Sequence, residues 1–272
     1  MAGLVHAIKS LIGSFYWLSA QGRWGVKRVF NDVYQGQPQS DTFRNIFRDV
    51  FGDDYPEEAD PCGLSTVTDL HNIVRQLGVG KGQTFVDLGC GRGGAGLWVA
   101  RATGARLIGV DISNVAVEEA QRRIPAFGLD GRAEFRTADF AGTGLPKASL
   151  DAAMSVDALY LVPDKTGSVR ETARILRPGA RFVFTTWDVD LPMMIRDHRP
   201  LLHSAGFDVE SYETTPDWQR RQRAVHERIL EQKEQLIKEM GEDSAKFWIM
   251  GAQTELPRLS RMRRILVVAR KR

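Results

Sequence analysis

The residues best placed to do chemistry lie in one glycine-rich stretch, TFVDLGCGRGGAGLWVA, at positions 84–100. A strand-like run at 84–88 leads into a turn with several glycines, and an apolar helical pattern follows at once. Glycines let the backbone N–H groups of such a turn come close to a ligand, and the N-terminus of the helix adds a partial positive charge. The stretch therefore predicts a site for a nucleotide-like molecule.

Two aspartates narrow the choice of ligand. The pattern Gly89-x-Gly91-x-x-Gly94, with Asp111 about 20 residues further on, also satisfies the fingerprint of dinucleotide-binding proteins. Asp87, however, lies two residues before the first glycine. A carboxylate at that position repels a pyrophosphate and attracts a cationic ligand. The aspartate therefore favours a positively charged nucleotide derivative over a dinucleotide.

The chain around the glycine turn alternates between strand and helix patterns. Further strands are expected at 106–111, 133–139, 150–157, 181–187, 207–212 and 263–269. Helices are expected at 65–77, 114–127, 165–176 and 194–205. Strands that alternate with helices of this length predict an α/β fold, a doubly wound and mostly parallel sheet covered on both faces.

Composition and charge set the broad class of the protein. With 272 residues, 43% of them hydrophobic, the chain can bury one α/β core and an accessory layer. The formal net charge is +3 and the basic residues are mostly interleaved with acidic ones, so no nucleic-acid partner is expected.

Cys62 and Cys90 show neither a disulfide framework nor metal-ligand spacing, so no metal is expected. No signal-peptide pattern and no membrane-spanning apolar run is present, and we expect a cytoplasmic protein.

Four segments of the chain resemble, in the same order, those of the class I S-adenosylmethionine-dependent methyltransferases, and the layout is similar to the small-molecule enzymes of secondary metabolism. The segments are VDLGCGRG at 86–93, GVDIS at 109–113, ADF at 138–140 and ILRPGARF at 175–182. The resemblance implies a seven-stranded, Rossmann-like sheet whose last strand is antiparallel. It also implies that S-adenosylmethionine is the cofactor.

The resemblance implies roles for the residues of the glycine turn. Those that would hold the methionine part of the cofactor, its ammonium group included, are Asp87 and the backbone of Gly89, Cys90 and Gly91. Asp111 would accept hydrogen bonds from both ribose hydroxyls, since a carboxylate suits a vicinal diol. The Cys90 side chain is more simply explained as a small buried filler than as a nucleophile.

The remaining cofactor contacts implied by the resemblance follow the later strands. Ile112 would pack on the adenine, and Asp139 would meet its amino group with Phe140 beside it. Ser155, near the end of the fourth strand, would line the methionine side. All these residues lie at carboxyl ends of strands, where open α/β sheets bind ligands. For Asp139, an N-cap of a following short helix is the alternative.

The reaction places few demands on catalytic side chains. Methyl transfer from a sulfonium is an in-line displacement, so much of the rate comes from positioning the acceptor. A base matters only when an N- or O-acceptor must lose a proton. Candidates for that base are Asp157, Tyr160, His71 and His226, of which Tyr160 directly follows the fourth strand. For the two histidines, a surface position on a helix is the commoner explanation.

The N-terminal part of the chain is expected to lie outside the core. Residues 1–62 are predicted to form a helical extension that begins with an amphipathic helix at 4–18. This helix is interpreted as a lid, as a subunit contact in a homo-oligomer or as simple packing. Between 20 and 62 the chain is rich in Gly, Asp, Asn and Gln, with a short helical pattern near 42–51.

The C-terminal part contains an insertion. The S-adenosylmethionine-binding core is predicted to span 63–215, and residues 261–272 supply its final strand. Between them, residues 216–260 form a predicted helical cap, with a long polar helix from 216 to about 240. Because the sixth strand ends at the carboxyl edge of the sheet, the insertion should cover the acceptor site.

Aromatic and apolar residues from both ends of the chain suggest the class of acceptor. They are Phe15, Tyr16, Trp17, Trp218, Phe247, Trp248 and Met250. They favour an aromatic or prenylated natural product, although core packing is the commoner role for any one of them. The sequence leaves C-, N- and O-methylation open. It also leaves two alternatives, an NAD-dependent oxidoreductase and a non-catalytic protein that has kept the cofactor-binding fold.

Overall fold

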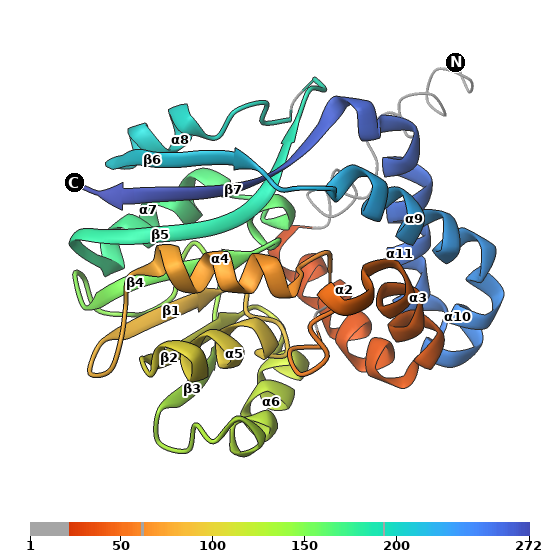
Figure 1. Cartoon of the computed structure of the whole chain (residues 1–272), viewed down its shortest axis with the longest axis horizontal. Helices are drawn as coiled ribbons and strands as arrows, with labels where there is room; N and C mark the ends of the chain where they lie inside the picture. The colour runs from red at the N-terminus through yellow and green to blue at the C-terminus, as the bar shows by residue number, and fades with distance from the viewer. Residues whose placement is uncertain (1–21, 61–62, 193) are drawn as a thin grey trace.

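A computed structural model describes residues 22–60, 63–192 and 194–272. It consists of a seven-stranded sheet with helices on both faces and a second group of helices at one end of that sheet (Figure 1). None of the helices in the described ranges is long and apolar enough to cross a membrane. Outside the described residues lie the helix expected at 4–18 and its aromatic residues Phe15, Tyr16 and Trp17.

The strand order is β3-β2-β1-β4-β5-β7-β6. The pairs from β3 to β5 are parallel, whereas β7 runs antiparallel to both its neighbours. This confirms the predicted mostly parallel sheet with an antiparallel last strand, and it differs from the order of dinucleotide-binding Rossmann folds. The strands are β1 (Thr84–Leu88), β2 (Arg106–Asp111), β3 (Ala133–Thr137), β4 (Leu150–Val156), β5 (Leu176–Val189), β6 (Phe207–Thr214) and β7 (Met262–Lys271).

Strand β1 lies in the middle of the sheet and is apolar on both faces. Phe85 and Val86 have no exposed surface, as expected for a strand buried between two layers of helices. Asp87 interrupts this apolar run and pairs in register with Gly109 of β2. The two parallel strands end at the same edge, which brings the turn after β1 next to Asp111, the last residue of β2.

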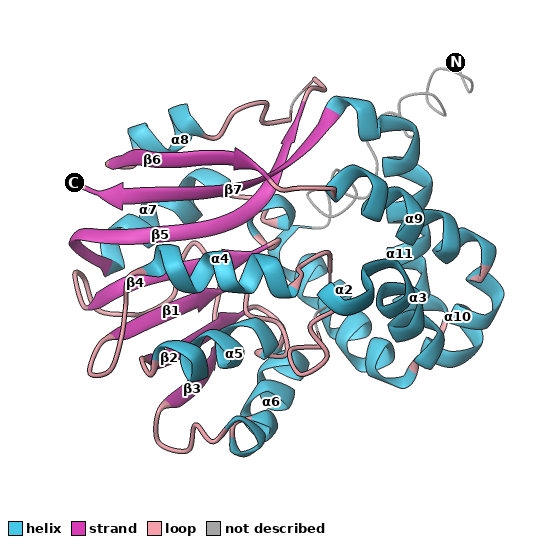
Figure 2. Ribbon diagram, viewed as in Figure 1, coloured by secondary structure: helices cyan, strands magenta, loops and turns pink. Residues whose placement is uncertain are grey.

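Helices cover both faces of the sheet (Figure 2). On one face pack α4 (Val67–Leu77), α5 (Gly94–Thr103) and α6 (Asn114–Arg123). On the other face pack α7 (Lys165–Ile175) and α8 (Arg199–Ser204). Each face therefore has its own apolar core, with the strands between the two.

Two of these helices are shorter than predicted, and a proline lies at each difference. The helix expected at 114–127 ends at Arg123 and is followed by a 3-10 turn, Pro125–Phe127. The helix expected at 194–205 is reduced to α8, where Pro200 occupies the first turn. Proline fixes its own backbone angle and lacks an N–H, so it is tolerated at the start of a helix but not within one.

A second group of helices, which we call the helical cap, lies beyond the carboxyl ends of β1 and β4 (Figure 1). Its members are α2 (Gly22–Gly36), α3 (Asp41–Phe51), α9 (Trp218–Glu231), α10 (Lys233–Met240) and α11 (Glu242–Glu255). Apolar residues of α3, α9, α10 and α11 share one core. Segments from both ends of the chain thus pack together. The division of the chain into residues 1–62, 63–215, 216–260 and 261–272 stays a prediction.

The helical cap differs from the prediction in two places. Helix α2 occupies part of the stretch that was expected to contain only a short helical pattern further on, near 42–51. The long polar helix predicted from residue 216 is interrupted at Gln232, which ends α9 and begins α10. Apolar residues of both helices nevertheless face the cap core, with Ile229 and Leu236 fully buried.

A buried ion pair network connects the sheet to α4 and to the loop after β4. Arg264 of β7 is 2% exposed and lies between Asp69 of α4 and Asp157. Its Nη1 donates to Asp69 Oδ2 at 2.8 Å. Its Nε and Nη2 donate to the two carboxylate oxygens of Asp157 at 3.1 and 3.0 Å. Removing one partner of such a buried ion pair destabilises the folded protein, because the other charge is left buried and unpaired.

We expect Arg264→Leu to lower the free energy of unfolding by about 3–5 kcal/mol, because it leaves two buried carboxylates without their shared cation. Arg261→Leu is the matched control, since Arg261 is exposed; it should change the free energy of unfolding by less than about 0.5 kcal/mol. Denaturant titration measures both values. Equal losses in the two variants would contradict the assigned role of the network.

Candidate active site

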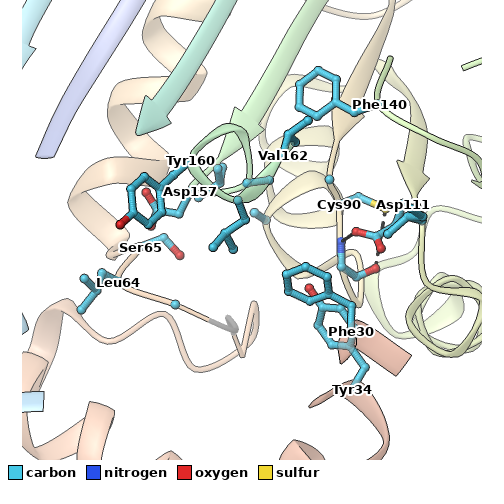
Figure 3. Close-up of a pocket in the computed structure, with 18 of the residues that line it drawn as sticks. Phe30, Tyr34, Leu64, Ser65, Cys90, Asp111, Phe140, Asp157, Tyr160 and Val162 are labelled. Carbon is cyan, nitrogen blue, oxygen red and sulfur yellow. Dashed lines mark hydrogen bonds between the residues drawn. The ribbon is translucent and has the colours of Figure 1, made fainter. Parts of the chain in front are cut away.

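A cavity of about 620 Å³ lies between the carboxyl ends of the strands and the helical cap. The glycine turn and the end of β2 line it on the sheet side, and α2, α9 and α11 line it on the cap side. Figure 3 shows Asp111 and Phe140 on one side of this cavity and Asp157 and Tyr160 on the opposite side. The cavity is within the size range of small-molecule sites, about 300–1,000 Å³.

Gly89 and Gly91 are two positions of the turn after β1 that require glycine. Gly89 has a φ of +73°, and a Cβ on it would lie 2.3 Å from the Cβ of Ala158. Gly91 has a φ of +52°, and a Cβ there would lie 2.7 Å from the hydroxyl of Tyr34 on α2. A side chain at either position would therefore be strained and would also displace the wall of the cavity.

Asp111 is held at the end of β2 by backbone donors. The N–H of Gly91 donates to its Oδ2 at 2.8 Å, and the N–H of Ser113 donates to its Oδ1 at 2.9 Å. Burial raises the pKa of Asp111, while these backbone donors and that of Ile112 lower it. Each carboxylate oxygen can accept a second hydrogen bond, so the group keeps capacity for a ligand.

Asp87 is the second buried carboxylate of the cavity wall. Burial, together with the nearby charge of Asp111, raises the pKa of Asp87 to about 7. The backbone N–H of Gly96 donates to it, and a Cβ on Gly96 would lie 2.7 Å from its Oδ2. Among the residues that the structure describes, no Lys or Arg side chain contributes to the pKa of Asp87 or of Asp111. Two such carboxylates fit a cationic ligand, which would replace the missing counter-charge.

Most of the other residues predicted to bind the cofactor also line the cavity. They are Cys90, Ile112, Asp139 and Phe140. Asp139 accepts a hydrogen bond from the N–H of Ala141 at 2.8 Å, which is a turn contact, and no helix follows it for an N-cap.

Ser155 differs from these residues, because it lies behind the glycine turn. It is fully buried and does not belong to the described residues that line the cavity. Its Oγ donates to the backbone carbonyl of Leu88 at 2.8 Å. Ser155 therefore holds the end of β1 in place, which orients the turn.

The three residues predicted to be catalytic all line the cavity, but their partners differ. Asp157 is paired with Arg264 and accepts a further hydrogen bond from the Thr185 hydroxyl at 2.7 Å. The hydroxyl of Tyr160 donates a hydrogen bond to Glu255. Burial, and to a lesser extent the charge of Glu255, raise the pKa of Tyr160 well above its usual value. Both groups are thus engaged by other protein groups. The fourth candidate, His71, lies exposed on α4, outside the cavity lining.

His226, the third residue predicted to be catalytic, belongs to a polar group on the cap side of the cavity. Its Nε2 lies 3.0 Å from Glu255 Oε2 and 3.3 Å from Gln222 Nε2. Gln222 Nε2 donates to the same oxygen of Glu255 at 2.6 Å. Neither Gln222 nor Glu255 was predicted from the sequence, since a single polar residue on a helix gives no signal that it lines a cavity.

Helix α2 also contributes to the site without having been predicted. Phe30 and Tyr34 line the cavity close to Asp111 (Figure 3). Asn31 accepts a hydrogen bond from the Ser113 hydroxyl at 2.7 Å, which ties α2 to the loop after β2. The spacing of Val26, Phe30 and Tyr34, at i, i+4 and i+8, was the available signal for this helix face.

The aromatic residues expected on the acceptor side are placed differently from one another. Phe247 and Trp248 of α11 line the cavity as predicted. Trp218 packs instead on a separate apolar cluster, and Met250 does not belong to the described cavity lining. Aromatic residues that were not predicted complete the wall, namely Phe30, Tyr34, Phe47 and Trp187.

Comparison with known proteins identifies the class of this fold and site. Residues 86–184 match the family described as "Methyltransferase domain". This segment runs from β1 into β5 and includes the glycine turn, Asp111 and Asp139. Residues 86–184 are therefore a methyltransferase domain, and this match agrees with the predicted enzyme class and cofactor. The antiparallel β7 leaves the alternative of an NAD-dependent oxidoreductase without support.

Curated relatives are similar over the same part of the chain. Methyltransferase GfsG of Streptomyces halstedii is 32% identical over 126 residues, which cover 46% of this chain and 45% of that protein. The 27-O-demethylrifamycin SV methyltransferase of Amycolatopsis mediterranei is 28% identical over 156 residues, 56% of each protein. The chain thus spans about half the length of the curated relatives that it matches.

Solved structures extend the similarity to the fold. The [4+2]-cyclase SpnF superposes with a TM-score of 0.65 and 21% identity, over 74% of this chain and 80% of SpnF. At this identity the similarity concerns the fold alone, and it confirms the predicted Rossmann-like architecture.

We expect the affinity for S-adenosylmethionine to rise about tenfold between about pH 6 and about pH 8. Asp87 is mostly protonated below its pKa of about 7 and mostly ionised above it, and only the ionised form attracts a cation. Calorimetric titration at several pH values measures this rise. Asp87→Asn is the control, because it removes the titrating carboxylate and leaves the titration of the cofactor unchanged. A rise of the same size in the variant would overturn the assignment to Asp87.

Proposed function

We propose that the protein transfers a methyl group from S-adenosylmethionine to a small, mainly apolar acceptor held between the sheet and the helical cap. One observation carries this proposal: a single cavity combines a wall of aromatic side chains with two carboxylates for which the described part of the chain supplies no Lys or Arg partner. The carboxylates suit a cationic donor, and the aromatic wall suits an apolar acceptor.

The donor occupies the sheet side of the cavity. When bound, S-adenosylmethionine supplies an electrophilic methyl group on a sulfonium. Asp111 binds the ribose hydroxyls with the lone pairs that its backbone donors leave free. Asp87 and the backbone of the glycine turn hold the methionine part, where the ionised carboxylate offsets the positive charge.

The adenine end of the donor lies against the loop regions after β2 and β3. Ile112 and Phe140 form the apolar contact with the ring, and Asp139 accepts a hydrogen bond from its amino group. Asp139 lines the cavity and is half-buried. Ser155 acts indirectly, through the end of β1 that it holds.

The acceptor occupies the side of the cavity that faces Asp157 and Tyr160, opposite Asp111 (Figure 3). The wall on the cap side is formed by Phe247 and Trp248. Aromatic rings bind flat or branched apolar groups, and they also face developing positive charge favourably. An aromatic or prenylated natural product fits this wall, and the relative that acts on 27-O-demethylrifamycin SV supports a natural product.

The direct test is transfer of label from methyl-labelled S-adenosylmethionine to a panel of acceptors. The panel consists of 27-O-demethylrifamycin SV, a sterol, geranyl diphosphate and 2-naphthol, so that polyketide, sterol, prenyl and aromatic classes are each represented. We expect one class to be labelled. Cofactor binding without transfer to any compound would instead favour the alternative of a protein that has kept the fold without this reaction.

We expect Asp111→Asn to weaken S-adenosylmethionine binding by about 1.5–3 kcal/mol, the loss typical of a hydrogen bond to a charged group. The amide presents one nitrogen donor where Asp111 now accepts from Gly91 or Ser113, so it also disturbs the turn. Asp130→Asn, at an exposed position, is the control. Calorimetry measures both, and unchanged binding in the Asp111 variant would remove the ribose assignment.

We expect Gly251→Leu to reduce methyl transfer at least about tenfold while cofactor affinity stays within about twofold, because Gly251 lines the cavity on the cap side. Gln253→Leu is the matched control, since it places the same side chain on the exposed face of the same helix. Transfer assays measure the loss of methyl transfer, and calorimetry measures the cofactor affinity. Parallel loss of cofactor binding and transfer would contradict an acceptor site beneath the cap.

A further inference from the structure

Two carboxylates line the acceptor side of the cavity next to Tyr160, and their surroundings differ. Asp157 faces the buried guanidinium of Arg264, which donates to both of its oxygens. Glu255 of α11 accepts hydrogen bonds from Gln222 and Tyr160 and faces the ring nitrogen of His226. Among the described residues no Lys or Arg forms an ion pair with Glu255, although Arg258 acts on it electrostatically.

This difference decides which of the two carboxylates keeps its negative charge available to a ligand. A guanidinium that donates to both oxygens of a carboxylate neutralises it. Donors such as an amide, a phenol and an imidazole orient a carboxylate without that full neutralisation. Glu255 lines the cavity, and its side chain is 19% exposed.

The orientation of Glu255 is fixed by a chain of donors that starts at the sheet. Trp187 Nε1 of β5 donates to Gln222 Oε1 at 3.1 Å. Since an indole nitrogen can only donate, the amide of Gln222 must turn its own nitrogen toward Glu255, which it reaches at 2.6 Å. The carboxylate of Glu255 is therefore oriented by Gln222 of α9, which Trp187 of β5 orients in turn.

We propose that Glu255 binds a hydroxyl group of the acceptor and takes up its proton, so that the reaction is an O-methylation. The proposal rests on the proposed function and specifies the atom that is methylated. Gln222, Tyr160 and His226 are positioning residues in this arrangement. They hold the carboxylate against the wall of the cavity while the acceptor lies beside it.

The step balances without a further reagent. The hydroxyl oxygen of the acceptor forms a bond to the methyl carbon as the carbon–sulfur bond breaks, and that bonding pair stays on sulfur. The hydroxyl proton passes to a carboxylate oxygen of Glu255, which becomes a carboxylic acid and releases the proton to water after the methyl ether leaves. A carboxylate is a sufficient base here, because the hydroxyl becomes strongly acidic as the new bond forms.

The proposal is tested by the position of the label in the product and by binding of a matched pair of probes. Methyl-13C-labelled S-adenosylmethionine and the acceptor panel locate the methyl group by NMR, and we expect an O-methyl signal. The probes are 2-naphthol and 2-methoxynaphthalene, titrated in the presence of S-adenosylhomocysteine. We expect the wild type to bind the hydroxyl compound about tenfold more tightly than its ether, as for a hydrogen bond to a charged group.

Variants separate this role from a structural one. Glu255→Gln should lower kcat about a hundredfold and reduce the preference for 2-naphthol at least threefold, with cofactor affinity unchanged. Glu255→Asp should restore part of kcat and part of the preference for 2-naphthol. Glu242→Gln, at an exposed position on the same helix, is the control. A methyl group on carbon or nitrogen, or an unchanged naphthol preference in the Glu255→Gln variant, overturns the proposal. Absence of transfer to any acceptor overturns the proposed function instead.

Discussion

Two buried carboxylates, for which the described residues supply no Lys or Arg counter-charge, are the constraint around which the site is built. Burying an unpaired carboxylate is costly, and Asp87 responds with a pKa of about 7. Both carboxylates lie on central strands of the sheet, and the register of β1 and β2 brings Asp87 and Asp111 to the same carboxyl end. Because a cationic ligand offsets the negative charge of these carboxylates, ligand binding and the local electrostatics are two aspects of one feature.

The sheet side of the site could be predicted from the sequence because each of its parts is local. The glycine turn, Asp87 and Asp111 lie within 25 residues of one another and follow regular strands. The cap side could not be predicted in this way. Gln222 and Glu255 are 33 residues apart, and they meet only because α9 and α11 pack against each other. Helix α2 was missed because its polar composition hid the spacing of its apolar face.

Residue type alone also failed to separate roles within the site. Asp157 and Glu255 are both carboxylates on the cavity wall, yet only one faces a buried guanidinium, and that partner comes from β7 at the end of the chain. Ser155 follows a strand as a ligand-binding residue would, yet it bonds to the backbone of β1. In each case the deciding information is a partner that is distant in sequence.

The division between sheet and cap separates the part of the chain that matches the family from the part that does not. The family match ends at residue 184, before the cap segments 218–255, and the α2 and α3 helices precede its start at residue 86. The carboxylates that suit the donor are therefore inside the shared segment, whereas Phe247, Trp248 and Glu255 are outside it. The sheet and the cap have separate apolar clusters, so a substitution in the cap core leaves the packing of the sheet in place. The acceptor must accordingly be determined from the cap of this chain and not from the names of proteins that share its sheet.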